Sequence, residues 1–241
     1  MSNYFQWFGK AAGTNESLPP DQSAKREEEA GVASLPKLIE GGLGRPRRRW
    51  GEVLADLLGK SALEGCDSLG VCPASTRRGA AYLTAALGEW IIQYADEPVL
   101  LVEANLRHPA LSASLGAPSG PGLVEALFDG AEEEQVIHRT SMPRLSVLPA
   151  GRPLRDRRQR EELGQRFRDY YRRLRRRFPN MIIDLPAADD ADYLTFPFDV
   201  PDAIVLAVAP RVTRVSEIQS AGRRLAASGS NVVAAMLNEE N

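Results

Sequence analysis

Short apolar runs separated by longer segments of helical pattern are the feature that most constrains the fold of this 241-residue chain. The runs lack polar alternation, which is typical of strands that are covered on both faces. Strands separated by helices imply right-handed strand–helix–strand units and a parallel sheet. The sequence therefore predicts a three-layer, doubly wound, mainly parallel α/β domain with strands at 68–72, 99–102, 145–149, 181–184, 203–208 and 232–237.

Helices are expected between these strands, where apolar residues recur at helical spacing. The segments are 50–58, 79–94, 122–128, 156–177 and 215–227. Asp156 can cap the longest of them. The apolar stripe of that helix comprises Leu163, Phe167, Tyr170, Leu174 and Phe178. The segment 79–94 is too apolar for a surface, so we expect it to pack against the sheet.

The region ahead of the domain has a different composition. Residues 1–35 are predicted to be a disordered tail, because 9–35 are polar and small and follow no period. Residues 36–49 are expected to be a basic linker, and 50–241 to be the folded domain. A net charge of -2 argues against a nucleic-acid partner. With no signal peptide and no apolar run of about 20 residues, we expect a cytoplasmic protein that can still join a membrane complex.

Aromatic residues gather near the N-terminus, at Tyr4, Phe5, Trp7 and Phe8. They are predicted to be a docking motif for a partner or a membrane interface, with 9–35 as a flexible leash. Two alternatives stay open: a sticky, untethered tail, or a segment that folds back on the domain.

Polar residues follow the strands at the edge of the sheet where ligands bind in this architecture. Glu103, Asn105 and Arg107 follow the strand at 99–102, and Asp184 ends the strand at 181–184. The segment Cys72–Gly79 follows the first strand. Between them, these segments hold the candidate site.

The order of several short phrases over residues 50–238 resembles the MinD/ParA-like P-loop ATPases, and in particular the cytoplasmic tyrosine-kinase domains of bacterial capsule and exopolysaccharide synthesis. The phrases are Leu106–Pro109, Gly120–Leu123, Leu148–Gly151, Ile182–Pro186 and Val232–Asn238. The resemblance implies a P-loop NTPase-like fold of the MinD/ParA type. It also implies a site for ATP and magnesium beside these strand ends.

The residues at that site depart from the family pattern. A P-loop needs glycines, a lysine and a magnesium-binding hydroxyl, whereas Arg78 and Gly79 stand at the last two positions. Ser75 or Thr76 could supply a hydroxyl only along another path of the loop. The two family aspartates that manage the magnesium nucleotide correspond to Glu103 and Asn105, and an amide cannot serve as a base.

Asp184 matches the metal-side aspartate of the family, and its alternative role is to cap the next turn. One acid without the lysine and the hydroxyl is insufficient for phosphoryl transfer. The tyrosine-rich tail of the kinases and their ring-assembly pattern are also missing, since Ala55 and Leu58 follow Glu52.

These departures predict a catalytically inactive accessory subunit of a bacterial exopolysaccharide system, with no catalytic residue, cofactor or metal. The expected partner is a membrane-embedded polysaccharide synthase or co-polymerase, which would hold the chain at the inner membrane. Any self-association should be independent of nucleotide. The alternative is an active MinD/ParA-like ATPase with an unconventional phosphate loop, including a positioning factor for cellulose secretion, which would use ATP and magnesium.

The arginine-rich helix 157–177 allows two interpretations. Its arginines are interspersed with acids at helical spacing, which predicts a solvated, ion-paired face. The alternative is an acidic partner or an anionic membrane surface. The cysteines Cys66 and Cys72 are too few for a disulfide framework and are expected to be small buried residues.

Overall fold

The computed structural model describes residues 7–8, 65–75, 80–94, 97–190, 196–209 and 212–237. Its strands are β1 (Trp7–Phe8), β2 (Ser68–Pro73), β3 (Val99–Glu103), β4 (His138–Arg139), β5 (Leu145–Leu148), β6 (Met181–Asp184), β7 (Ala203–Val208) and β8 (Val232–Leu237). Its helices are α4 (Ala81–Tyr94), α5 (Leu111–Ser114), α6 (Leu123–Phe128), α7 (Glu133–Val136), α8 (Arg157–Arg177) and α9 (Val215–Ala227). The predicted helix at 50–58 and the predicted basic linker lie outside the described residues.

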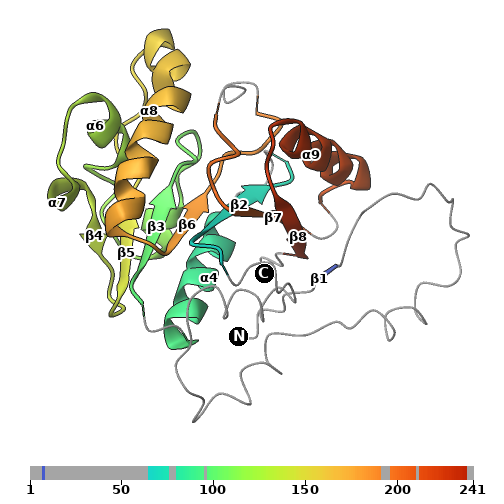
Figure 1. The fold of residues 1–241 in the computed structure, drawn as a ribbon, viewed down its shortest axis with the longest axis horizontal. Coiled ribbons are helices and arrows are strands. Elements are labelled where there is room, and N and C mark those ends of the chain that lie inside the picture. The colour runs from blue at the N-terminus through green and yellow to red at the C-terminus, as the bar shows by residue number, and fades with distance from the viewer. Residues whose placement is uncertain are drawn as a thin grey trace, which may run out of the picture.

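The strands form a single sheet in the order β1-β8-β7-β2-β6-β3-β5-β4 (Figure 1). From β8 to β5 all neighbouring strands are parallel. The two short outer strands, β1 and β4, run antiparallel to their neighbours. The prediction of a doubly wound, mainly parallel sheet is therefore confirmed.

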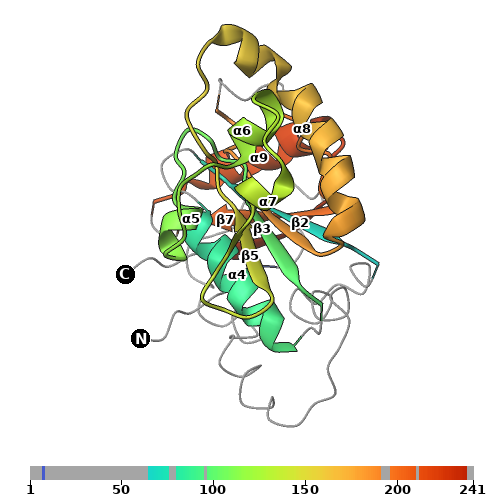
Figure 2. The ribbon, with the colours of Figure 1, turned by 90° about the vertical axis from the view of Figure 1, so that its left-hand side faces the viewer.

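Helices cover both faces of this sheet and make a three-layer domain. Figure 2 shows α4 and α5 on one side of the strands and α8 on the other. Successive strand residues point to opposite faces, so Leu101 and Ile182 pack with α4, whereas Val102 and Ile183 pack with α8. Since both faces are buried, the strands have no polar alternation.

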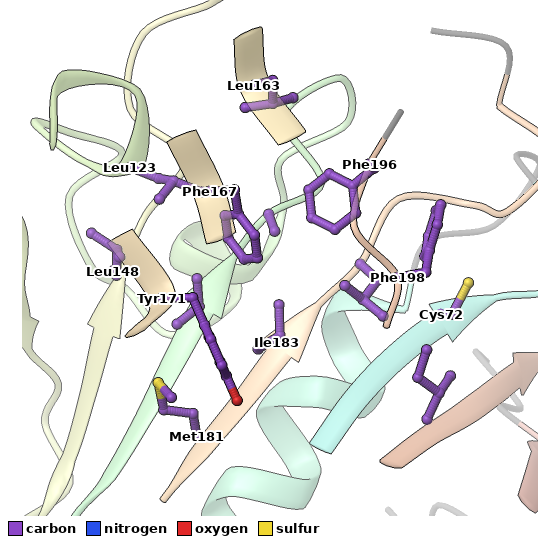
Figure 3. Packing of buried hydrophobic residues seen from close by; sticks show 14 of the residues in the cluster. Cys72, Leu123, Leu148, Leu163, Phe167, Tyr171, Met181, Ile183, Phe196 and Phe198 are labelled. Atoms are coloured by element: carbon purple, nitrogen blue, oxygen red, sulfur yellow. The ribbon is translucent and has the colours of Figure 1, made fainter. Parts of the chain in front are cut away.

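Helix α8 is held against the sheet by its apolar stripe. Its N-cap is Asp156, as predicted, and the Oδ1 atom accepts a hydrogen bond from Gln159 N at 2.9 Å. Leu163, Phe167, Tyr170 and Leu174 are buried, and Phe178 at the end of the stripe is half-buried. Figure 3 shows Phe167 beside Phe196, with ring centroids 5.0 Å apart. Burial of an aromatic side chain of this size contributes about 1.5–3 kcal/mol.

The charged residues at the other end of α8 fasten it to the start of β2. Arg175 donates hydrogen bonds to Asp67 at 2.9 Å and to Asp202 at 3.1 Å. Asp202 Oδ2 also accepts hydrogen bonds from the backbone N–H and the hydroxyl of Ser68, at 3.0 Å each. The Tyr171 hydroxyl lies 2.7 Å from the Ser68 hydroxyl. This polar cluster fixes the register of α8 on the sheet.

The elements that the sequence did not predict are short. They are the four-residue helices α5 and α7 and the two-residue strands β1 and β4. None of them is long enough to show a hydrophobic period. The predicted strand at 145–149 ends one residue earlier, at Leu148.

Candidate functional site

The carboxyl ends of β3 and β6 bring the two acids of the predicted site together. These strands are neighbours, and Glu103 stands directly opposite Asp184 in their register. Leu101 and Ile182, two residues earlier on each strand, belong to the core on the α4 side. Because strand side chains alternate, both carboxyl groups project toward the same face. Two buried acids on adjacent strands therefore share one side of the sheet edge.

Glu103 uses its carboxylate to hold its own chain together. The Oε1 atom accepts a hydrogen bond from Leu111 N at 2.6 Å, at the start of α5. The Oε2 atom accepts from Ser112 Oγ at 2.9 Å and from Ala150 N at 3.0 Å. The side chain is fully buried. Both oxygens thus accept hydrogen bonds from two segments, α5 and the turn after β5.

Asp184 is equally buried but has the opposite environment. Neither carboxyl oxygen has a hydrogen-bond partner among the described residues, so the alternative role of Asp184 as a cap of the next turn is not seen there. Burial and the nearby charge of Glu103 raise the pKa of Asp184 well above its usual range. Because no described donor reaches Asp184, its environment favours the protonated form of this carboxyl group.

The other predicted residues at this edge have separate contacts. Asn105 is buried, and its Oδ1 atom accepts a long hydrogen bond from His108 N at 3.4 Å. Arg107 reaches across to the loop after β6 and donates to Asp190 at 3.0 Å. Its side chain is 50% exposed, whereas that of Asp190 is 5% exposed. Sequence reasoning missed Asp190, because only the fold brings this loop beside Arg107.

The phosphate-loop segment is described only as far as Ser75, which is buried. Thr76, Arg78 and Gly79 lie outside the described residues, and α4 begins just after them at Ala81. Cys72, at the end of β2, is fully buried and lies near Pro186, whose carbonyl oxygen accepts from its Sγ at 3.4 Å. Burial raises the pKa of Cys72 to about 12, so its thiol is neutral. Cys66 is also buried, in agreement with the prediction for both cysteines.

Two of the family-like phrases interlock next to Glu103. Leu123 N and Val124 N donate to the carbonyl oxygens of Pro149 and Ala150, at 2.8 and 3.0 Å. A side chain at Gly122 would place its Cβ 2.2 Å from Pro149 O. Glu125 completes the contact by accepting from Gly122 N at 2.7 Å and from Arg152 N at 3.0 Å. The phrases at 120–123 and 148–151 therefore support the sheet edge structurally.

The acids interspersed along α8 pair with its arginines, as predicted for a solvated face. Glu162 bridges Arg158 and Arg166, at 2.6 and 2.8 Å. Other pairs join Arg157 to Glu161, Arg172 to Asp169, Arg168 to Asp199, and Arg177 to Glu133 and Glu134. Most of the positive charge of α8 thus has a partner within the fold.

The remaining predictions concern metals, membranes and the N-terminal aromatics. Among the residues that the structure describes, no three His, Cys, Asp or Glu side chains gather in a way that could hold a metal ion. None of the described helices combines the length and apolarity needed to span a bilayer. Trp7 and Phe8 form β1, while Tyr4 and Phe5 lie outside the described residues. Docking through these aromatics stays a prediction.

The fold has clear counterparts among solved structures, although the sequence matches no protein-family model and no curated protein. The chimerical protein CapA2B2 is similar with a TM-score of 0.65 and 19% identity, over 85% of this chain and 98% of that one. The kinase domain of the Escherichia coli tyrosine kinase ETK is similar with a TM-score of 0.63 and 21% identity, over 71% of this chain and 67% of that one. The MinD protein of Pyrococcus horikoshii, complexed with Mg-ADP, is similar with a TM-score of 0.52 and 20% identity, over 68% of this chain and 67% of that one.

These neighbours are of the two kinds that the sequence resemblance names, a bacterial tyrosine-kinase domain and a MinD ATPase. At this level of identity the similarity establishes the fold. The chain therefore has the α/β fold of the P-loop NTPases, in the form shared by MinD and the bacterial tyrosine-kinase domains.

Proposed function

We propose that this chain is a catalytically inactive relative of the bacterial tyrosine-kinase domains and acts as an accessory of an exopolysaccharide synthesis or secretion system. It would act through protein contacts, from the cytoplasmic side, on a membrane-embedded synthase or co-polymerase. The observation that carries the proposal is the carboxylate of Glu103, whose two oxygens both serve the fold. The link to polysaccharide synthesis comes from the sequence resemblance.

The residues at the sheet edge do not fit a magnesium nucleotide. Magnesium binds through a few well-placed oxygen ligands, and its chemistry in phosphoryl transfer needs carboxylates that are charged and free to turn toward it. Both oxygens of Glu103 already accept hydrogen bonds, from Leu111, Ser112 and Ala150. Asn105 is neutral, and burial beside Glu103 raises the pKa of Asp184, which favours the protonated form of that group. By sequence, Arg78 and Gly79 replace the lysine and the hydroxyl of the phosphate loop.

One observation favours the competing function, a working ATPase with an unconventional loop. A buried carboxyl group without a hydrogen-bond partner, such as Asp184, is costly unless a ligand completes its environment. A bound cation would lower the pKa of Asp184 and hold it in the charged form. In that case Arg78 would have to contact the phosphates. A positioning factor for cellulose secretion would need the same nucleotide binding.

Calorimetry with ATP and magnesium separates the two functions. We expect no heat of binding at micromolar protein, and phosphate release no greater than that of the Asp184→Ala variant. Micromolar binding that is lost in both Arg78→Ala and Asp184→Ala would establish the ATPase instead. Sedimentation with and without ATP adds a second readout, because an inactive accessory should have the same mass in both conditions.

The partner is tested separately, by recovering the chain from cells together with membrane proteins of polysaccharide synthesis. We expect the intact chain and the Asp184→Asn variant to recover the same partner, since neither needs nucleotide. A chain that recovers no membrane protein under conditions that preserve such complexes would contradict the accessory role without restoring an ATPase role.

A further inference from the structure

β8 forms an edge of the parallel part of the sheet. On one side it pairs with β7, with a register shift between Ile204 and Val205. Its sequence, Val-Val-Ala-Ala-Met-Leu, contains neither a charge nor a proline. An apolar edge strand offers unpaired backbone groups to other strands, and proteins normally protect such an edge with charges, proline, a bulge or a cover. Of these protections, the strand itself has only the bulge. We therefore expect another segment to cover its outer edge.

The cover is β1, which comes from the other end of the chain. Trp7 stands opposite Met236 and Phe8 opposite Ala235, in antiparallel register. β1 stands outside the parallel strand–helix–strand series, and residues 9–67 separate it from β2 in the sequence. The paired residues belong to the aromatic segment 4–8, the most apolar part of the N-terminal region. A short aromatic strand from the N-terminal region therefore pairs with the apolar edge strand of the same chain.

We propose that the outer edge of β8 is a strand-docking site and that its occupant is β1, Trp7–Phe8 of the same chain. The segment caps the edge reversibly. Two paired residues make few backbone hydrogen bonds, so a free peptide of this sequence would bind weakly. The covalent connection raises its local concentration, which for flexible linkers reaches the order of millimolar and falls as the linker lengthens.

The cap has two consequences. While it is in place, the edge of β8 is closed to strands of other chains, which keeps the protein from associating edge to edge. When it leaves, an apolar backbone edge and an aromatic segment are released together. A partner that binds the aromatics would have to compete with β8. The inference does not rest on the proposed function, since it concerns only β1 and β8.

Hydrogen exchange read by mass spectrometry tests the cap on the full-length protein. Neighbouring residues of a strand direct their N–H groups to opposite sides, so the double variant Trp7→Pro/Phe8→Pro removes whichever one faces β8. We expect peptides that cover 232–237 to exchange about tenfold faster in this variant. The control Thr14→Pro/Asn15→Pro places the same residues outside the segment and should leave β8 unchanged. Peptides of β3, inside the sheet, should be unchanged in both variants.

Two outcomes would overturn the proposal. Equal exchange of β8 in the intact chain and the Trp7→Pro/Phe8→Pro variant would mean that the segment does not cap the edge. A dimer of the intact chain, detected by light scattering and lost in that variant, would mean that the segment sits on a second copy. A monomer whose β8 loses protection only in the Trp7→Pro/Phe8→Pro variant supports the intramolecular cap.

Discussion

Replacing Asp184 with asparagine should stabilise the protein at neutral pH and remove a pH dependence. The side chain is fully buried, and both oxygens lack hydrogen-bond partners among the described residues. Burial is the main cause of its raised pKa, and the negative charge of Glu103 on the adjacent strand adds to it. Asparagine has nearly the same shape but cannot ionise. The Asp184→Asn variant therefore keeps the packing and removes the titration.

The sign and size of the effect follow from proton linkage. In the unfolded chain an aspartate titrates near pH 4 (about 3.9), whereas folded Asp184 keeps its proton to a much higher pH. Between these two pKa values the native state binds one proton more than the unfolded state. The free energy of unfolding then falls by about 1.4 kcal/mol for each pH unit. This contribution is fully present below the unfolded pKa and is lost as the pH rises toward the folded pKa.

Urea unfolding of both proteins from pH 4.5 to 8 measures this difference directly. The advantage of Asp184→Asn should grow by about 1.4 kcal/mol per unit until the folded pKa is reached. For a domain of this size that corresponds to about 3–5 °C in Tm for each unit. Asp199→Asn serves as a control of opposite sign, because Arg168 lowers the pKa of Asp199. Its effect should be a loss of stability that disappears as the pH falls.

A constant difference between Asp184→Asn and the parent over this range would refute the reasoning. It would mean that Asp184 is charged in the native state at every pH tested. A charged Asp184 has an environment that stabilises a carboxylate, and such an environment could also hold a cation. The proposal of an inactive site would then be supported by the hydrogen bonds of Glu103 and no longer by Asp184.

Four further substitutions test the packing, capping and hydrogen bonding of the fold. Gly122→Ala should destabilise by about 3 kcal/mol or more, since its Cβ would overlap Pro149 O, whereas Gly222→Ala, in open space on α9, should stabilise by up to about 1 kcal/mol. Asp156→Ala should cost about 0.5–2 kcal/mol in urea unfolding through loss of the α8 cap. Tyr171→Phe should cost about 1 kcal/mol by breaking its contact with Ser68, and no loss would show that water replaces that contact.

The long elements could be predicted because their cause is local. The uninterrupted apolar run Val99–Val102 and the apolar stripe of α8 are visible in the sequence, and both are buried in the fold. The short elements could not, since α5 has four residues and β1 has two. Their existence depends on contacts with distant segments, such as the pairing of β1 with β8.

The candidate site divides in the same way. Its residues could be placed at one sheet edge, because parallel strands end together. Their roles could not, as Glu103 takes its hydrogen bonds from Leu111 and from Ala150, on two separate segments. For Asp184 the sequence left two roles open, a metal ligand or a cap of the next turn, and its oxygens make no capping hydrogen bond among the described residues. No signal in the sequence distinguishes an acid that has three donors from one that has none.

Glu103 and Asn105, which stand where the resemblance expects aspartates, have one electrostatic explanation in common. Two acids that face each other on β3 and β6 are tolerated in a buried site if one is neutral or if a cation lies between them. The extra methylene of glutamate lets position 103 reach Ser112 and Ala150, so its charge is satisfied within the fold. The neutral Asn105 then avoids a third buried carboxylate beside the pair. An edge that balances its charge from its own donors has no electrostatic need for magnesium, and this balance is the physical argument behind the proposed inactive accessory.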